Sequence, residues 1–225
     1  MFLIMLGACL ALLSNAAAND SAPQKPPVVV ELFTSEFCPA CPPADQYLAK
    51  LSNEANMITL GCHVTYFQGR SDLGRPFCSQ RQFDYMRQLR GKSPFTPQFV
   101  INGHRSVVGT RQSEVAASLL KAQSADTQYI NIYPKAHGVY GYELPLIPLG
   151  QYTLFMALYQ TEQTVRGRQY ASAVDLILNL GDWDGVSDAR VFFPAVRDNH
   201  AGFAIFAKEL KSGKIMAAGK YHFGA

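Results

Sequence analysis

Two cysteines three residues apart are the most reactive feature of the sequence. Cys38 and Cys41 enclose Pro39 and Ala40, which is the Cys-x-x-Cys spacing of a reversible dithiol. Such a pair exchanges electrons with a substrate disulfide through a mixed disulfide, so one thiol must be exposed and attack while the second resolves the intermediate. We assign Cys38 as the nucleophile and Cys41 as the resolving thiol, because the N-terminal cysteine of such a motif is the natural nucleophile.

The remaining cysteines are expected to have a structural role. The chain has five cysteines, and removal of Cys9 with an N-terminal signal would leave four, for which three pairings are open. If Cys38 and Cys41 form the reactive pair, Cys62 and Cys78 pair by default and close a loop of about 15 residues, worth about 3 kcal/mol. A four-thiolate zinc site is the alternative, but Cys62 and Cys78 are far apart and lack a His at ligand spacing. We therefore expect no metal and no cofactor.

The first 18 residues have the pattern of a secretory signal peptide. An uncharged apolar run gives way to small residues, with Ala16 and Ala18 as the cleavage pair. Cleavage after Ala18 predicts a periplasmic or secreted protein, in an oxidising compartment where disulfides persist. A buried N-terminal strand or helix, or lipidation at Cys9, are the alternatives.

Composition excludes several classes of protein. The chain of 225 residues is 48% hydrophobic and 16% charged, which is enough apolar sequence for a buried core and argues against global disorder. A formal net charge of +3 without a run of like charges does not favour a nucleic-acid partner. After the N-terminus no stretch reaches the roughly 18 to 20 apolar residues that a membrane span requires.

Hydrophobic periodicity in the first half predicts alternating strands and helices. A nearly continuous apolar run before the dithiol is typical of a strand buried on both faces, and a turn at Asn102-Gly103 separates two short strands. The predicted strands are 28–33, 57–66, 98–101 and 105–108, and the predicted helices are 43–51, 79–90 and 114–123.

The second half changes to short alternating runs separated by turn residues, which predicts a small β-sandwich. Its expected strands are 129–133, 153–160, 169–178, 190–193, 203–208 and 215–222. The resulting domain limits are a signal peptide at 1–18, a proline-containing linker at 19–27, a first domain at 28–125 and a β-rich domain at 128–225.

The order of elements in the first half, with the dithiol directly after the first strand, resembles that of thioredoxin-like proteins. We therefore expect an α/β fold, with a thioredoxin-like N-terminal domain followed by a small all-β, sandwich-like C-terminal domain. The resemblance implies a cis peptide bond at Thr96-Pro97 facing the dithiol, where the backbone of Thr96 would pair with an extended substrate chain. An ordinary trans proline opening an edge strand is the alternative.

A more specific resemblance covers almost the whole mature chain. The segments 30–35 (VELFTS) and 38–45 (CPACPPAD) resemble the domain of unknown function 1223 family, whose members are mostly secreted bacterial proteins. The likeness continues at 63–66, 96–103 and 181–185. The chain departs from the family pattern at Thr65 and Phe67. The family name leaves the activity open, so the resemblance bears on the fold more than on the function.

Three further features are weaker candidates. Glu31, seven residues before Cys38, is a candidate proton relay, but its register points it to the other face of the strand, which favours a solvated or a structurally bonded carboxylate. His63 is a candidate copper ligand with the dithiol, although a lone His on a strand is more often packed. Asp182 and Asp184 are too few carboxylates for a calcium site, and their segment is typical of a turn.

The favoured function is therefore a thiol–disulfide oxidoreductase acting on a thiol- or disulfide-containing protein or small molecule, with a possible redox partner protein. Cys38 attacks, Cys41 resolves, and Thr96 with Pro97 shapes the substrate groove. Two alternatives stay open: a non-catalytic thioredoxin-like binding module in which the Cys38–Cys41 bond is structural, and a copper-handling protein that uses the dithiol and His63. The sequence does not indicate the direction of the redox reaction.

Overall fold

The computed structural model describes residues 25–67, 69–186, 189–192, 194, 197 and 199–224. The predicted signal peptide at 1–18, Cys9 and residues 19–24 of the predicted linker lie outside these residues. None of the described helices is long and apolar enough to cross a membrane.

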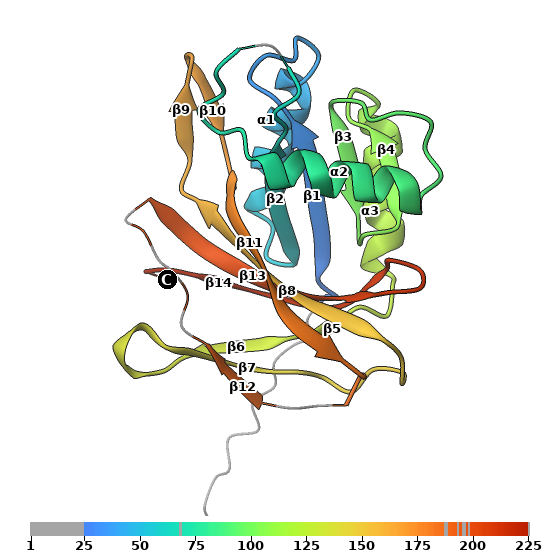
Figure 1. Ribbon diagram of the computed structural model, residues 1–225, viewed down its shortest axis with the longest axis vertical. Coiled ribbons are helices and arrows are strands. Elements are labelled where there is room, and N and C mark those ends of the chain that lie inside the picture. Colours follow the sequence, from blue (N-terminus) through green and yellow to red (C-terminus); the bar gives the residue numbers. More distant parts are fainter. Residues whose placement is uncertain are drawn as a thin grey trace, which may run out of the picture.

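A four-stranded mixed sheet carries the dithiol loop (Figure 1). Its order is β2-β1-β3-β4, with β1 (Val28–Thr34) parallel to β2 (Met57–His63), and with β3 (Gln98–Ile101) antiparallel to both β1 and β4 (Arg105–Val108). Every residue of β1 is buried. The apolar sequence of this strand therefore reflects a central position with both faces covered.

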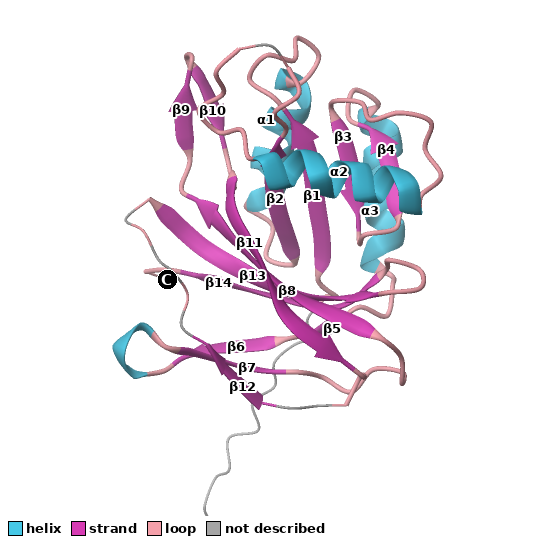
Figure 2. Cartoon of the chain, viewed as in Figure 1, coloured by secondary structure: helices cyan, strands magenta, loops and turns pink. Residues whose placement is uncertain are grey.

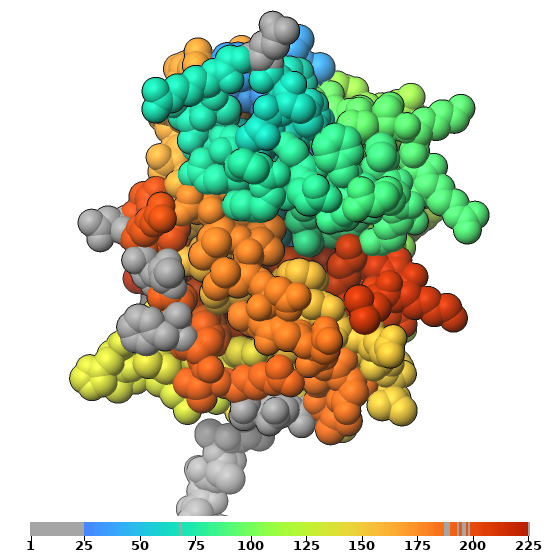
Figure 3. Space-filling view, in the orientation of Figure 1, coloured from blue at the N-terminus to red at the C-terminus, as the bar shows by residue number. Residues whose placement is uncertain are grey.

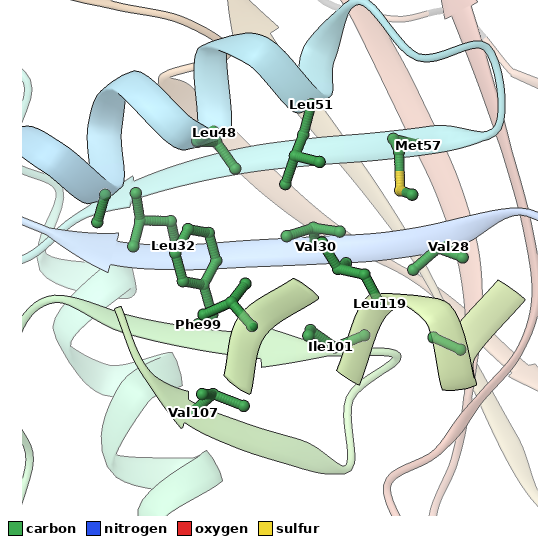
Figure 4. Close-up of a cluster of buried hydrophobic side chains, with 13 residues drawn as sticks. Val28, Val30, Leu32, Leu48, Leu51, Met57, Phe99, Ile101, Val107 and Leu119 are labelled. Carbon is green, nitrogen blue, oxygen red and sulfur yellow. The ribbon is translucent and has the colours of Figure 1, made fainter. Parts of the chain in front are cut away.

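One face of this sheet is covered by α1 (Pro42–Ser52) and α3 (Gln112–Gln123). Alternate residues of β1 point to this side, and Figure 4 shows Val30 and Leu32 between Leu48 of α1 and Leu119 of α3. The opposite face receives α2 (Pro76–Gln88) through a cluster that includes Phe33, Cys62, Cys78, Tyr85 and Val100. Because successive side chains of β1 point to opposite faces of the sheet, this strand contributes to two separate apolar cores.

The second half of the described chain is built of strands and one short 3-10 turn, Ala136–Gly138 (Figure 2). A five-stranded sheet has the order β11-β8-β13-β14-β5, a three-stranded sheet has the order β12-β7-β6, and β9 and β10 form a separate hairpin. Their bounds are β5 Gln128–Tyr129, β6 Asn131–Pro134, β7 Tyr140–Glu143, β8 Tyr152–Gln160, β9 Gln163–Val165, β10 Arg168–Tyr170, β11 Val174–Trp183, β12 Ala189–Phe192, β13 His200–Glu209 and β14 Ile215–His222.

The five-stranded sheet is the middle layer of the molecule (Figure 1). One of its faces packs on the four-stranded sheet, where Val29 and Leu60 meet Ala157 and Phe206. Its other face packs against the three-stranded sheet in a second apolar cluster that includes Tyr142, Leu154 and Phe203. In Figure 3 the strand β11 lies directly beneath the α2 segment on the front face, where Arg75 and Asp175 form a salt bridge at 2.7 Å.

The predicted fold class, an α/β protein with a thioredoxin-like N-terminal domain and a small all-β C-terminal domain, is wrong. The described residues are mostly strand, 41% against 20% helix, with three α-helices and several sheets, and they are not plainly all-β either. The physical reason lies on the α2 face of the first sheet. Helices cover both faces of an α/β sheet, whereas here α2 covers only part of that face and the five-stranded sheet covers the rest. The domain limits 28–125 and 128–225 stay a prediction.

Candidate active site

The Cys38–Cys41 disulfide lies in the loop between β1 and α1, with Cα atoms 5.4 Å apart. Two backbone hydrogen bonds fold this loop: the Cys38 N–H donates to the Ser35 carbonyl at 3.1 Å, and the Cys41 N–H donates to the Cys38 carbonyl at 3.2 Å. These successive turns bring the two sulfurs together at the end of the buried strand. The two predicted reactive cysteines are therefore joined in a disulfide, the oxidised form, in this structure.

Helix α1 begins directly after the dithiol. Cys41 is its N-cap residue, and two prolines occupy its first positions, Pro42 and Pro43. Proline suits these positions because the first N–H groups of a helix lack an intrahelical partner. The next two N–H groups, of Ala44 and Asp45, donate to the Cys41 carbonyl at 2.9 and 3.0 Å. The N–H groups that follow the two prolines are thus both bonded to the backbone carbonyl of Cys41.

Cys38 is less exposed than the sequence predicted. In the disulfide form 3% of Cys38 and 0% of Cys41 is exposed, although the intervening Pro39 and Ala40 are exposed. The neighbouring Phe37 is covered by the guanidinium of Arg166, which lies 4.6 Å from the ring centroid. The exposed surface next to this bond is therefore formed by Pro39 and Ala40.

The second predicted element, Thr96-Pro97, lies beside the first turn of α1. Its peptide bond is cis, as expected. The Pro97 carbonyl accepts a hydrogen bond from the Gly109 N–H at 2.8 Å. A Cβ atom on Gly109 would lie 2.8 Å from the Cβ of Pro97 and 3.1 Å from that of Ala44. Only a glycine lets these three backbones approach so closely, so Pro97 is held near the helix turn that follows Cys41.

A glutamine network fixes the segment that leads to Pro97. The Gln82 side-chain amide of α2 donates to the Phe95 carbonyl and to the Gln98 side chain, both at 2.8 Å. The hydroxyl of Tyr66 donates to the same glutamine at 2.9 Å. Tyr66 and Phe95 themselves are partly exposed, so two aromatic rings flank the approach to Thr96.

The structure contains the Cys62–Cys78 disulfide expected from the cysteine count. It joins β2 to the first turn of α2, with Cα atoms 5.3 Å apart, and both residues are buried. This bond ties α2 to the sheet on the face opposite α1. Its burial inside an apolar cluster with Phe33 and Tyr85 is typical of a structural disulfide.

A buried polar group lies on the other side of the dithiol loop. Glu36 accepts hydrogen bonds from the backbone N–H groups of Asp72 and Leu73 at 2.9 and 3.0 Å and from the Ser71 hydroxyl. Burial raises the pKa of Glu36, but the bonds from Ser71 and Leu73 outweigh it and hold the pKa below its ordinary value. The adjacent His63 has its Nδ1 3.9 Å from Glu36. Burial lowers the pKa of His63 to about 4, against the attraction of Glu36.

Asp45 is the most perturbed carboxyl group of the site. It lies in the first turn of α1, is 6% exposed, and accepts a hydrogen bond from the Thr34 hydroxyl at 2.7 Å. Its other oxygen, Oδ2, is buried and has no hydrogen-bond partner among the described residues. Burial raises the pKa of Asp45 to about 7, although the Thr34 bond and the charge of Arg168 lower it.

The β9–β10 hairpin from the second half of the chain covers this part of the site (Figure 1). A cavity of about 430 Å³ lies between α1 and the hairpin. It is lined from α1 by Pro42, Asp45 and Gln46, and from the hairpin by Thr164, Arg168 and Tyr170 among others. The Tyr170 ring also meets the His63 ring edge-on, with centroids 5.0 Å apart. The second half therefore contributes side chains to the site, which the sequence did not reveal.

Residues 29–207 match the model of the protein family described as "Protein of unknown function (DUF1223)". The chain belongs to the DUF1223 family. This match spans the dithiol loop, Thr96-Pro97 and the β9–β10 hairpin. It confirms the family that the sequence motifs indicated.

The solved structures that resemble this DUF1223 chain include the following two. The crystal structure of protein AGR_C_4864 from Agrobacterium tumefaciens is 26% identical, with a TM-score of 0.78, over 89% of this chain and 96% of that one. HBP35 of Porphyromonas gingivalis is 16% identical, with a TM-score of 0.61, over 88% of this chain and 75% of that one. The second likeness concerns the fold alone. No curated protein matches the chain significantly.

Glu31 is structural in this DUF1223 chain, as its register favoured. It forms a salt bridge with Arg81 and accepts a hydrogen bond from the Tyr85 hydroxyl, both on α2. Because α2 and α1 cover opposite faces of the sheet, Glu31 points away from the helix that follows the dithiol. The proton-relay role considered for Glu31 is therefore not supported.

The copper and calcium hypotheses gain no support. Among the described residues no group of three or more His, Cys, Asp or Glu side chains could hold a metal ion, and His63 faces Glu36 and Tyr170. The segment 181–185 is not a turn throughout, because 181–183 are the last residues of β11. After the strand, Asp184 accepts the Val186 N–H at 3.0 Å, and the Trp183 indole donates to the Val186 carbonyl.

Proposed function

We propose that the protein is a thiol–disulfide oxidoreductase of an oxidising, extracytoplasmic compartment and that Cys38 and Cys41 carry its chemistry. The observation that supports this most is the position of their disulfide, in the loop between the buried strand β1 and the start of α1. The presence of a second disulfide, Cys62–Cys78, agrees with an environment in which thiols are oxidised.

The short loop of the Cys38–Cys41 bond argues against a purely structural role. Its cysteines are separated by 3 positions, whereas Cys62 and Cys78 are separated by 16. The chain-entropy model gives about 2 kcal/mol for the shorter loop and about 3 kcal/mol for the longer one. The bond that stabilises the fold less is thus the one whose cysteines, although buried, flank the exposed Pro39 and Ala40.

The proposed reaction needs no cofactor. The Cys38 thiolate attacks a substrate disulfide, forms a mixed disulfide and releases one substrate thiolate. Cys41 then attacks the Cys38 sulfur, which forms the Cys38–Cys41 bond and releases the second substrate thiolate. Two electrons pass from the dithiol to the substrate, and the reverse sequence oxidises a substrate dithiol. The substrate is a protein or small molecule that carries a thiol or a disulfide.

Thr96 and Pro97 are the proposed substrate-binding residues. The contact of Pro97 with Gly109, and of Gly109 with Ala44, supports this role because it holds the Thr96-Pro97 segment next to the turn that follows Cys41. An extended substrate chain would pair with the backbone of Thr96. The partly exposed rings of Tyr66 and Phe95 would border it.

A second candidate function is a binding module in which the Cys38–Cys41 bond is permanent. The observation that favours it is the 3% exposure of Cys38. A protein of this kind would keep its ligand binding after either cysteine is replaced, because no sulfur would take part in it.

Two matched serine variants test the proposed function. We expect Cys38→Ser to lose all catalysis of insulin reduction by dithiothreitol, so that only the uncatalysed rate is left, and to trap no mixed disulfide. Cys41→Ser should accumulate a mixed disulfide on Cys38, which mass spectrometry of the unreduced protein detects. Unchanged turnover in Cys38→Ser, or the absence of any adduct in Cys41→Ser, would refute the assignment.

A further inference from the structure

Asp45 combines three properties that are rare in one surface-helix residue. It is buried, one of its oxygens has a partner in Thr34, and the other oxygen has none among the described residues. A buried polar atom without a partner costs about 1–3 kcal/mol, so its presence calls for an explanation. No structural bond of the fold requires an acid here, since an amide would also accept the Thr34 hydrogen bond.

Asp45 lies one helical turn after the resolving cysteine. Its N–H donates to the Cys41 carbonyl at 3.0 Å, which is the i to i+4 bond of the helix. Side chains four residues apart on a helix share one face, with Cβ atoms about 5–6 Å apart. A carboxyl group at this separation reaches a thiol directly or through one water molecule.

Cys41 needs such a neighbour. It is 0% exposed, so bulk water does not take up its proton when it attacks the mixed disulfide. The thiolate, not the thiol, is the nucleophile. Among the described charged groups, Glu36 already accepts three hydrogen bonds and Glu31 lies on the opposite face.

We propose that Asp45 accepts the proton of the Cys41 thiol when Cys41 resolves the mixed disulfide. This inference rests on the proposed function. In the step, the Cys41 S–H proton moves to the Asp45 carboxylate, the Cys41 thiolate attacks the Cys38 sulfur, and the substrate leaves as a thiolate. In the reverse direction, the Asp45 carboxyl returns the proton to the Cys41 thiolate that reduction sets free.

The β9–β10 hairpin alters the pKa of Asp45, and the cavity beside it is a route for the Asp45 proton to solvent. Asp45 faces Thr34 and Glu36 on one side and Arg168 and Tyr170 of β10 on the other. Burial under the hairpin raises the pKa of Asp45 to about 7, while the charge of Arg168 opposes the rise and Glu36 adds to it. The cavity between α1 and the hairpin borders Asp45 and connects it to solvent.

The two steps of the reaction can be separated with a chromogenic aromatic disulfide, 5,5′-dithiobis(2-nitrobenzoate). When the dithiol-reduced protein is mixed rapidly with it, attack by Cys38 releases the first thionitrobenzoate, and resolution by Cys41 releases the second. We expect the rate of the second phase to rise with pH through an inflection near the pKa of Asp45, about 7. The first phase reports only on Cys38.

Three variants test the assignment. Asp45→Asn should slow the second phase about 100-fold, the ordinary contribution of a general base, and remove its inflection near neutral pH. Arg168→Gln should move the inflection to higher pH, because a charge that lowers the pKa of Asp45 is lost. Arg166→Gln is the matched control. It also removes one positive charge from the hairpin, but Arg166 does not line the cavity, so the inflection should stay in place.

The outcomes separate this inference from the function on which it rests. If neither phase appears in the unaltered protein, the proposed function fails. If both phases appear and Asp45→Asn keeps the rate and pH profile of the second phase, only the role of Asp45 is overturned. A shift of the inflection in Arg166→Gln equal to that in Arg168→Gln would also overturn it.

Discussion

Replacement of Asp45 by Asn should change the pH dependence of stability by an amount that follows from the structure. The pKa of this carboxyl rises from its ordinary value of 3.8 to about 7 on folding. Between these values the folded state binds more protons than the unfolded state, so the Asp45 contribution to stability falls as pH rises through this window. At 1.36 kcal/mol for each unit between about pH 5 and the folded pKa of about 7, the loss is about 2.7 kcal/mol once the pH has risen from about 5 to about 8.

His63 has the opposite effect on the pH dependence of stability. Its pKa falls from 6.5 to about 4 on folding, so the unfolded state binds more protons in that window and the His63 contribution to stability rises with pH. The two effects partly cancel in the unaltered protein. The difference in stability between Asp45→Asn and the unaltered protein removes the His63 effect, because both proteins contain this histidine.

The assay is urea unfolding of both proteins at a series of pH values from about 5 to about 8. We expect the stability difference to shift by about 2.7 kcal/mol in favour of Asp45→Asn across this range, and to change little above about pH 8. A difference that is constant within about 0.5 kcal/mol, the usual limit for independent surface changes, would show that the carboxyl titrates normally and would refute the reasoning.

Two further predictions concern the scaffold. Gly109→Ala should destabilise the protein by about 1–3 kcal/mol in urea unfolding, because the added Cβ would lie 2.8 Å from Pro97 and the rigid proline ring cannot turn away; unchanged stability would show that this contact is loose. The double variant Cys62→Ser with Cys78→Ser should lose about 3 kcal/mol and keep the thiol exchange of Cys38; loss of exchange in a folded double variant would contradict the separate roles of the two disulfides.

Local sequence patterns predicted most elements near the dithiol. The strands at 98–101 and 105–108 coincide with β3 and β4, because a turn at Asn102-Gly103 limits them on both sides. The helix expected at 79–90 begins three residues earlier as α2, at Pro76, since proline fits the first helical turn. The register argument for Glu31 was also right, because the side-chain period of a strand is strictly two.

Long-range pairing was not predictable in the same way. The expected strand at 169–178 is divided into β10 and β11, and its first part leaves the sheet to form the hairpin over α1. The strands β7 and β9 were not predicted. The contact of the five-stranded sheet with Val29 and Leu60, which corrects the fold class, joins apolar residues whose partners local patterns do not specify.

The residues of the candidate site also fall into those that the sequence predicted and those that it did not. Cys38, Cys41, Thr96 and Pro97 carry recognisable spacing and position in the sequence. Asp45 stands within the CPPAD motif but has no signal of its own. Its altered pKa arises from burial under a hairpin more than 100 residues further along the chain, and only the folded structure brings the two together.

The reduction potential of the Cys38–Cys41 bond tests the central claim most directly. The protein would be equilibrated in glutathione buffers of graded potential, alkylated, and analysed by mass spectrometry for each cysteine pair separately, with Cys62–Cys78 as the internal reference. We predict a potential well above about −300 mV for Cys38–Cys41, in the range of exchanging disulfides. A value at or below about −300 mV, equal to that of Cys62–Cys78, would contradict the account and identify both bonds as structural.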